Sequence, residues 1–162
     1  MEIRNIEAKH FSQMANIYLE GIATGMATFQ TEAPDWDKWD NNHLSNCRRA
    51  VFTDEQMAGW AALSPVSGRC VYAGVAEVSI YMAAKYRGKG IGKLLLLDLI
   101  KQSEQAGFWT LQSGIFPNNI ASIKLHEQCG FRQIGYREKI GKKDGIWHDN
   151  IIMERRSKLI GV

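Results

Sequence analysis

The chain has 162 residues, 45% of them hydrophobic and 23% charged, a composition that is typical of globular proteins and excludes a disordered or collagen-like chain. The formal charge of +3 comes from 20 Lys and Arg against 17 Asp and Glu, interspersed along the chain, so no nucleic-acid partner is expected. This length favours a single domain over residues 1–162.

Apolar runs and cysteines bear on where the protein works. No apolar run approaches the roughly 20 residues of a membrane span, so we expect a soluble protein without a membrane partner. The three cysteines, Cys47, Cys70 and Cys129, are far apart and form no CxxC motif. This argues against a disulfide framework or a zinc ribbon and favours the reducing environment of the cytoplasm.

In the first half of the chain, apolar residues recur at helical spacing in two segments. The predicted elements, in chain order, are a short strand at 3–6, a helix at 10–21, a loop at 25–29, a helix from Pro34 to about 47, and an antiparallel hairpin of strands at 50–52 and 57–63.

In the second half, alternation of apolar and polar residues predicts a long strand at 71–82. The elements predicted after it are a helix at about 91–106, a strand at 108–115, a helix at 119–129, and two strands at 131–140 and 146–155. The two hairpins among alternating strands and helices predict an α/β fold with a mixed sheet rather than a wholly parallel one.

A glycine-rich turn, Arg87-Gly88-Lys89-Gly90-Ile91-Gly92, separates the strand at 71–82 from the next helix. Such a turn can point backbone N–H groups at an anion at the helix N-terminus, and the basic side chains add charge there. The turn fits neither the GxGxxG nor the Walker pattern, because the required Gly or Lys-Ser/Thr positions are occupied by other residues. The residues alone leave open a diphosphate cradle of another type or a tight turn with solvated charges.

A second polar helix start, Asn118-Asn119-Ile120-Ala121-Ser122, follows the strand at 108–115. By itself it indicates an N-cap. Together with the glycine-rich turn, however, it resembles the GCN5-related N-acetyltransferase superfamily, with the turn at the position of the pyrophosphate loop. Further segments are similar to the phosphinothricin and methionine sulfoximine or sulfone N-acetyltransferases: Ala27-Thr28-Phe29, Glu77-Val78-Ser79-Ile80-Tyr81, and Gly145-Ile146-Trp147-His148-Asp149. The resemblance spans nearly the whole chain and is weakest at 33–50.

This resemblance implies a central, mostly antiparallel sheet flanked by about four helices. It implies direct transfer of acetyl from acetyl-CoA to the α-amino group of a small amino-acid analogue, with no metal. The cofactor contacts that it implies are Ile80, Tyr81, Met82, Arg87, Gly88, Lys89, Gly90, Ile91, Gly92, Asn119 and Ser122. The implied acceptor contacts are Thr28, Phe29, Arg69 and Tyr72, with Arg69 as a clamp on the substrate carboxylate and Trp147 as a further pocket wall.

Two residues are candidates for proton transfer. Glu77 lies in a strand of apolar and small residues, where a half-buried carboxylate would have a raised pKa that suits a base. From the residues alone, a strand-edge Glu paired with a Lys is the alternative. His126 stands where many superfamily members carry a tyrosine acid, and it is either a proton shuttle or a structural helix histidine.

Two alternatives to this function remain open. The acceptor is another amine, such as a polyamine, an aminoglycoside or a protein N-terminus, or the chain is a non-catalytic CoA-binding module. The presence of both Glu77 and His126 argues against the module. A small-molecule amine is the expected partner, and a homodimer is one of the assemblies that the sequence allows.

Overall fold

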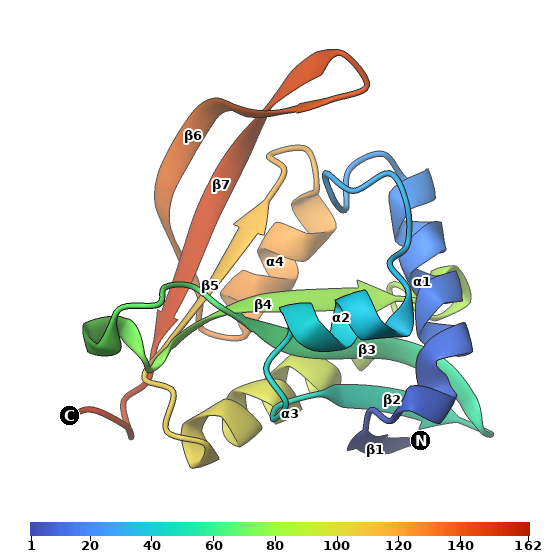
Figure 1. The fold of residues 1–162 in the computed structure, drawn as a ribbon, viewed down its shortest axis with the longest axis horizontal. Helices are drawn as coiled ribbons and strands as arrows, with labels where there is room; N and C mark the ends of the chain where they lie inside the picture. Colours follow the sequence, from blue (N-terminus) through green and yellow to red (C-terminus); the bar gives the residue numbers. More distant parts are fainter.

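The computed structural model describes residues 1–162, which are built around one seven-stranded sheet (Figure 1). In chain order the strands are β1 (Glu2–Asn5), β2 (Arg49–Thr53), β3 (Gln56–Pro65), β4 (Val75–Met82), β5 (Thr110–Ile115), β6 (Arg132–Lys143) and β7 (Ile146–Arg156). They lie in the order β1-β2-β3-β4-β5-β7-β6, and every neighbouring pair except β4 and β5 is antiparallel. The mixed, mostly antiparallel sheet is confirmed.

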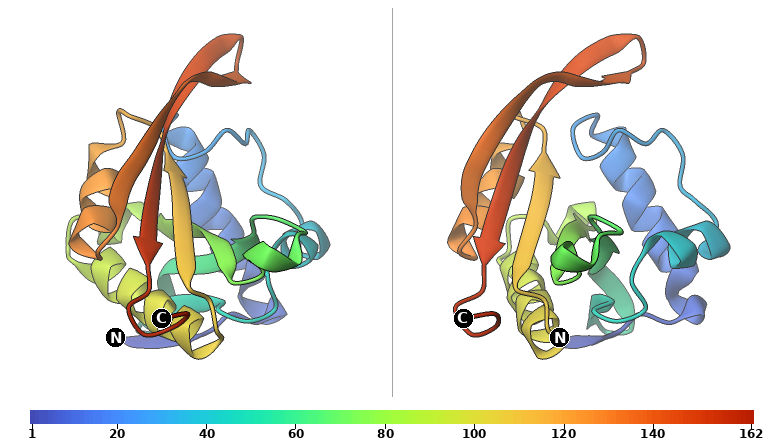
Figure 2. Two further views of the ribbon diagram at one scale, coloured as in Figure 1. Left: turned by 90° about the vertical axis from the view of Figure 1, so that its left-hand side faces the viewer. Right: turned by 60° about the vertical axis from the view of Figure 1, so that its left-hand side comes forward.

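Four α-helices cover the two faces of this sheet (Figure 2). They are α1 (Phe11–Ala23), α2 (Trp36–Asn42), α3 (Ile91–Gln105) and α4 (Ile120–Gln128). Met14, Ile17 and Trp39 of α1 and α2 form one core with Trp60, while the leucines of α3 form a larger core on the opposite face. None of the helices is long and apolar enough to cross a bilayer.

The strand predicted at 71–82 begins four residues later than the sequence indicates. Cys70–Tyr72 forms a 3₁₀ turn, and the strand starts at Val75. The alternation of apolar and polar residues is misleading here because Gly74 packs directly against the Trp109 ring. A Cβ at position 74 would come within 2.0 Å of the indole. This contact with a residue 35 positions away sets the strand boundary.

The helix predicted from Pro34 to about 47 is also shorter than expected. The Asp35 carboxylate caps its start by accepting from the Lys38 N–H at 2.9 Å. It ends at Asn42 because His43 is extended and the Leu44 N–H donates to the Leu63 carbonyl of β3 at 2.8 Å. The Leu44 N–H therefore bonds to β3 instead of continuing the helix.

The sheet opens between its only two parallel strands. Pairing of β4 with β5 covers three residues on each strand and ends at Glu77 opposite Gln112. Beyond that point β5 turns away from β4 (Figure 1), which continues to pair with β3 as far as Met82. Backbone N–H and C=O groups on the open side of β4 are therefore free to bind a ligand.

The long β6–β7 hairpin projects from the body of the molecule (Figures 1 and 2). Its tip turns at Asp144 and Gly145, which both have positive φ, as a tight hairpin requires. From there the hairpin reaches the segment between α1 and α2, since the Lys143 ammonium donates to the Thr28 carbonyl at 3.0 Å. The hairpin thus holds the segment that carries Thr28 and Phe29.

Candidate active site

A groove of about 470 Å³ runs from the turn before α3 to the first turn of α4. Nine of the eleven residues expected to contact the cofactor line it: Ile80, Tyr81, Met82, Arg87, Gly88, Gly90, Gly92, Asn119 and Ser122. The other two do not. Ile91 is buried in the core, and the Lys89 ammonium lies 5.7 Å from the centre of the Tyr86 ring.

The glycine-rich turn makes the end of this groove an anion site. Gly88 and Gly90 have φ values of 72° and 77°, a backbone conformation that side chains other than glycine rarely adopt. Gly90 is the N-cap of α3, so the first N–H groups of that helix have no partner within the helix. Arg87 and Lys93 line the same part of the groove. Free N–H groups, the helix dipole and two cations fit a diphosphate.

Asn119 has a structural part in this groove. Its side-chain oxygen accepts from the Ser122 N–H at 3.3 Å, which caps α4, and its amide nitrogen donates to the Met26 carbonyl at 3.3 Å. The side chain therefore ties the segment after α1 to the start of α4, across the groove, and both its ends are occupied.

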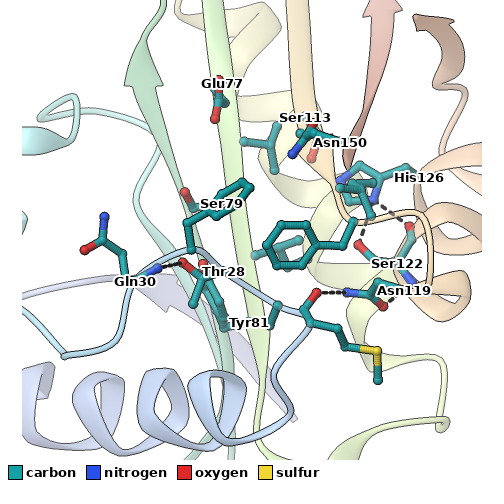
Figure 3. A pocket seen from close by; sticks show the side chains of 18 of the residues that line it. Thr28, Gln30, Glu77, Ser79, Tyr81, Ser113, Asn119, Ser122, His126 and Asn150 are labelled. Atoms are coloured by element: carbon teal, nitrogen blue, oxygen red, sulfur yellow. Dashed lines mark hydrogen bonds between the residues drawn. The ribbon is translucent and has the colours of Figure 1, made fainter. Parts of the chain in front are cut away.

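A polar cavity of about 380 Å³ opens between the diverging parts of β4 and β5 (Figure 3). Thr28, Phe29, Glu77 and His126 line it, as do Ser79, Ser113 and Asn150, which stand on three different strands. The cavity and the groove have six lining residues in common: Met26, Ala27, Ile80, Tyr81, Asn119 and Ser122. The two spaces therefore adjoin along these residues.

Glu77 lies where β4 and β5 part, and its carboxylate lines the polar cavity. The side chain accepts a hydrogen bond from the Gln112 amide at 3.1 Å. Glu77 is exposed, so the half-buried position expected from the strand pattern is wrong. Glu77 is paired on both sides, with Ser64 of β3 and Gln112 of β5, so its exposure means that this part of the sheet face is left uncovered.

His126 is 1% exposed and lies on the other side of the cavity, on α4. Its Nδ1 is 2.7 Å from the Ser122 carbonyl, which has no proton to give, so Nδ1 carries the ring proton and donates it. Nε2 is then an acceptor, and it is buried without a partner. Burial lowers the pKa of His126, against the opposing effect of the Ser122 carbonyl, so the ring is neutral at pH 7.

Thr28 and Phe29 are held in place on the cavity wall. The Thr28 hydroxyl lies 3.3 Å from the Tyr18 hydroxyl and accepts from the Gln30 N–H at 3.1 Å. The Phe29 ring packs edge-on against Phe116 at 4.6 Å between centroids. Tyr81 lies below them with a phenol whose pKa is raised by burial.

Three of the expected pocket residues do not line the cavity. Arg69 and Tyr72 lie on the exposed segment before β4, with the guanidinium 5.6 Å from the Tyr72 ring centre. Arg69 makes no ion pair within the chain. Trp147 is 56% exposed on the hairpin, where Lys142 lies over its ring.

Asn150 of β7 is a cavity residue that the sequence analysis does not single out. Its side-chain oxygen is buried without a partner, and so, across the cavity, is Nε2 of His126. The only signal in the sequence is an amide at the start of the apolar run Ile151-Ile152-Met153. Two buried acceptors without donors indicate that the cavity takes a ligand with N–H or O–H groups, or water.

Comparison with known proteins places these features in context. The profile described as the Acetyltransferase (GNAT) family matches residues 11–131. Bacillus subtilis YwnH, provisionally named a phosphinothricin acetyltransferase, is 33% identical over 160 residues, which cover 96% of this chain and 98% of that protein.

Two solved structures have similar folds. The ribosomal-protein-alanine N-acetyltransferase of Brucella melitensis has a TM-score of 0.89 at 26% identity, covering 97% of this chain and 100% of that one. A phosphinothricin acetyltransferase of Sinorhizobium meliloti, in complex with acetyl-CoA, has a TM-score of 0.85 at 28% identity, covering 96% of this chain and 87% of that one.

Proposed function

The chain belongs to the acetyltransferase (GNAT) family, and from this membership we propose that it transfers acetyl from acetyl-CoA to the α-amino group of a small amino-acid analogue. The analogue is of the phosphinothricin, methionine sulfoximine or methionine sulfone type. The observation that carries the proposal is that the anion-binding groove adjoins the polar cavity, so that an acetyl group carried in the groove can meet an amine held between Glu77 and His126.

The groove holds the cofactor by its diphosphate and its chain. The N–H groups at the start of α3 bind the diphosphate, with Arg87 and Lys93 beside it. The open edge of β4, from Ile80 to Met82, offers backbone groups to the amide-bearing arm. Acetyl-CoA supplies an acyl group already activated as a thioester, and the groove delivers it to the cavity.

Glu77 accepts the proton that the acceptor's ammonium group must lose before it can attack. A positioned base contributes about 10²–10⁴ in rate, and holding the amine near the thioester contributes more. As the C–N bond forms, the C–S bond breaks, and the leaving thiolate takes up the second proton that the attacking nitrogen loses, directly or through water, to give the free thiol. The neutral His126 accepts a hydrogen bond through Nε2, directly or through water, and so orients the amine rather than protonating the thiolate.

Arg69, which lies outside the cavity lining on the exposed segment before β4, is the proposed clamp on the acceptor carboxylate. Its guanidinium is exposed, has no acidic partner within the chain, and stands on the segment that leads into Glu77. A free planar guanidinium can make two parallel hydrogen bonds with a carboxylate. Arg69→Ala should then raise the KM of the acceptor and leave the KM of acetyl-CoA unchanged.

Thiol release from acetyl-CoA, followed with purified protein and each of the three analogues, tests this function. We expect release with at least one analogue, an N-acetylated product by mass spectrometry, and at least a hundredfold lower kcat/KM for the decarboxylated analogue. Release with none of them, but with spermidine or an aminoglycoside, would contradict the acceptor class and leave the family intact.

A second candidate acceptor is the N-terminus of a protein. It is favoured by the likeness to the Brucella melitensis enzyme, which is named as a ribosomal-protein-alanine N-acetyltransferase. The same assay with a peptide that begins with alanine separates the two candidates, because an α-amine within a peptide is followed by an amide and not by a carboxylate. Faster release with the peptide than with every analogue would favour this second function.

A further inference from the structure

A second cavity lies beside the polar cavity and has no part in the function proposed above. Its volume is about 380 Å³, within the range of roughly 300–1,000 Å³ typical of small-molecule sites. Tyr18, Gln30, Ser79 and Tyr81 line both cavities, so the two cavities adjoin along these four residues. We call the second cavity the aromatic slot; its remaining lining residues are Glu32, Ala33, Pro34, Lys38, Trp39, Asn42, His43 and Trp60.

The rings of the slot are fixed against one another. Ring centroids are 4.9 Å apart for Tyr18 and Tyr81, and also for Trp60 and Tyr81. Trp39 lies 5.7 Å from Trp60 and stacks on His43 at 4.4 Å. Both tryptophans are almost fully buried in the core under α1 and α2. The slot therefore needs little rearrangement to receive a ligand, which favours binding.

The slot has no net charge. Its two ionised residues, Glu32 and Lys38, are exposed and opposite in sign. His43 is neutral at pH 7 because burial lowers its pKa, and its Nδ1 donates to the Trp39 carbonyl at 2.7 Å. An ionised group placed among the rings would lose hydration there, and Glu32 and Lys38, being exposed, would offset little of that cost. The lining is therefore suited to an uncharged group, and aromatic faces favour another ring.

β4 leads from the proposed base to this slot. Glu77, Ser79 and Tyr81 alternate along the strand, so they share one face, and successive members are about 7 Å apart. In Figure 3, Ser79 lies between Gln30 and the side of the cavity that carries His126. An amino acid whose amine lies at Glu77 can therefore extend its side chain past Ser79 into the slot.

We propose that the aromatic slot receives the side chain of an aromatic α-amino acid, so that the enzyme acetylates such amino acids in addition to the analogues named above. This proposal rests on the proposed function, because it takes Glu77 as the place of the acceptor amine. Most of the residues confined to the slot lie within 33–50, where the resemblance to the phosphinothricin-type enzymes is weakest.

Acetylation of L-phenylalanine and of L-methionine sulfone, measured side by side, tests the slot. We expect the wild type to acetylate phenylalanine with kcat/KM at least tenfold above that for L-lysine or L-glutamate, whose side chains are charged. In Ala33→Phe, which places a ring in the slot, the ratio of kcat/KM for phenylalanine to that for methionine sulfone should fall at least tenfold, mainly through KM. Ala106→Phe, at the exposed end of α3, is the control and should keep the wild-type ratio.

Asn42→Phe, at the exposed end of α2, is a second slot-filling variant should Ala33→Phe fail to fold. Acetylation of methionine sulfone, but of no aromatic amino acid, overturns the slot and leaves the proposed function standing. Acetylation of phenylalanine with an unchanged ratio in a folded slot variant overturns the slot in the same way. If none of the amino acids or analogues causes release of thiol from acetyl-CoA, the proposed function is overturned, and the slot proposal with it.

Discussion

The single most informative side chain is His126, because its surroundings fix where its proton lies. The Ser122 carbonyl, 2.7 Å from Nδ1, accepts a hydrogen bond from the proton on that nitrogen. The unpartnered Nε2 is left as an acceptor at the cavity. A neutral imidazole in this tautomer has no proton to give through Nε2. The sequence leaves open a proton shuttle or a structural helix histidine; this tautomer excludes an acid acting through Nε2, and the choice between the two roles stays a prediction.

The pH dependence of stability reports the burial of this ring. Because burial lowers the pKa of His126 below 6.5, the unfolded chain binds a proton below that pH while the folded chain does not. The free energy of unfolding should therefore be highest above pH 6.5 and fall as the pH is lowered from there toward the folded-state pKa, by at most about 1.4 kcal/mol per unit for this group.

Urea denaturation at about pH 7 and about pH 5.5 measures this difference. His126→Gln should show a smaller loss between the two pH values than the wild type. His10 and His43 also have pKa values lowered by burial, and they remain in both proteins, so the comparison isolates His126. An equal loss in both proteins would mean that His126 is not buried as a neutral ring.

Among the elements, the turn before α3 carries a conformational requirement that can be separated from its binding role. Gly90 and Gly107 both have positive φ, at opposite ends of α3, and both have open space where a Cβ would stand. Substitution by Ala should cost each about 1–2 kcal/mol in free energy of unfolding. Only Gly90 lines the groove, so only Gly90→Ala should also raise the KM of acetyl-CoA, by roughly tenfold.

Thermal denaturation and initial rates on the two variants provide the measurement. Gly107→Ala is the matched control, since it carries a similar backbone strain away from the groove. If the KM of acetyl-CoA were unchanged in a folded Gly90→Ala protein, the start of α3 would not be the diphosphate site.

The contact between the hairpin and the segment after α1 makes a separate prediction for the acceptor. A Cβ at Gly141 would stand 2.7 Å from the Phe29 ring, whereas at Gly135 on the same strand it would meet nothing within 4 Å. Gly141→Ala should therefore displace Phe29 from the cavity wall and raise the acceptor KM several-fold. Gly135→Ala should leave that KM unchanged, and similar values for both variants in steady-state assays would contradict the positioning role of the hairpin.

Local patterns predicted the elements well where a single element decides its own structure. The hairpin of β2 and β3, the helix α3 and the start of α4 follow from periodicity, turn residues and capping. The patterns failed where contacts with distant residues decide the structure. Gly74 packs against Trp109 just before β4 begins, and the Leu44 N–H donates to the Leu63 carbonyl of β3 instead of extending α2.

The candidate site divides in the same way. The groove residues were predictable because the glycine-rich turn and the start of α4 are continuous motifs. The exposure of Glu77 depends on which elements cover its face of the sheet, and Lys143 reaches Thr28 across 115 positions of sequence. Neither relation leaves a local signal. The slot residues of α2 have no motif either and become recognisable only when the rings are seen together.

In the whole molecule, the sheet opens between β4 and β5, and three cavities lie around β4. The groove lies at the end near α3, the polar cavity lies where β5 departs, and the aromatic slot lies toward α2. Tyr81 of β4 lines all three cavities, so this one strand contributes to the wall of each. Glu77 is the last residue of β4 that pairs with β5, and it lines the polar cavity. The proposed function therefore depends on this residue more than on any other.

The decisive measurement is kcat for Glu77→Gln at neutral pH, with the acceptor that the wild type uses best. Glu138→Gln, exposed on β6 outside the cavity, is the control and should behave as the wild type. We predict that Glu77→Gln lowers kcat by about 10²–10⁴ while the KM of acetyl-CoA stays within about twofold, because only the proton acceptor is lost. Turnover of a folded Glu77→Gln protein near the wild-type rate would contradict a catalytic base at the parting of β4 and β5.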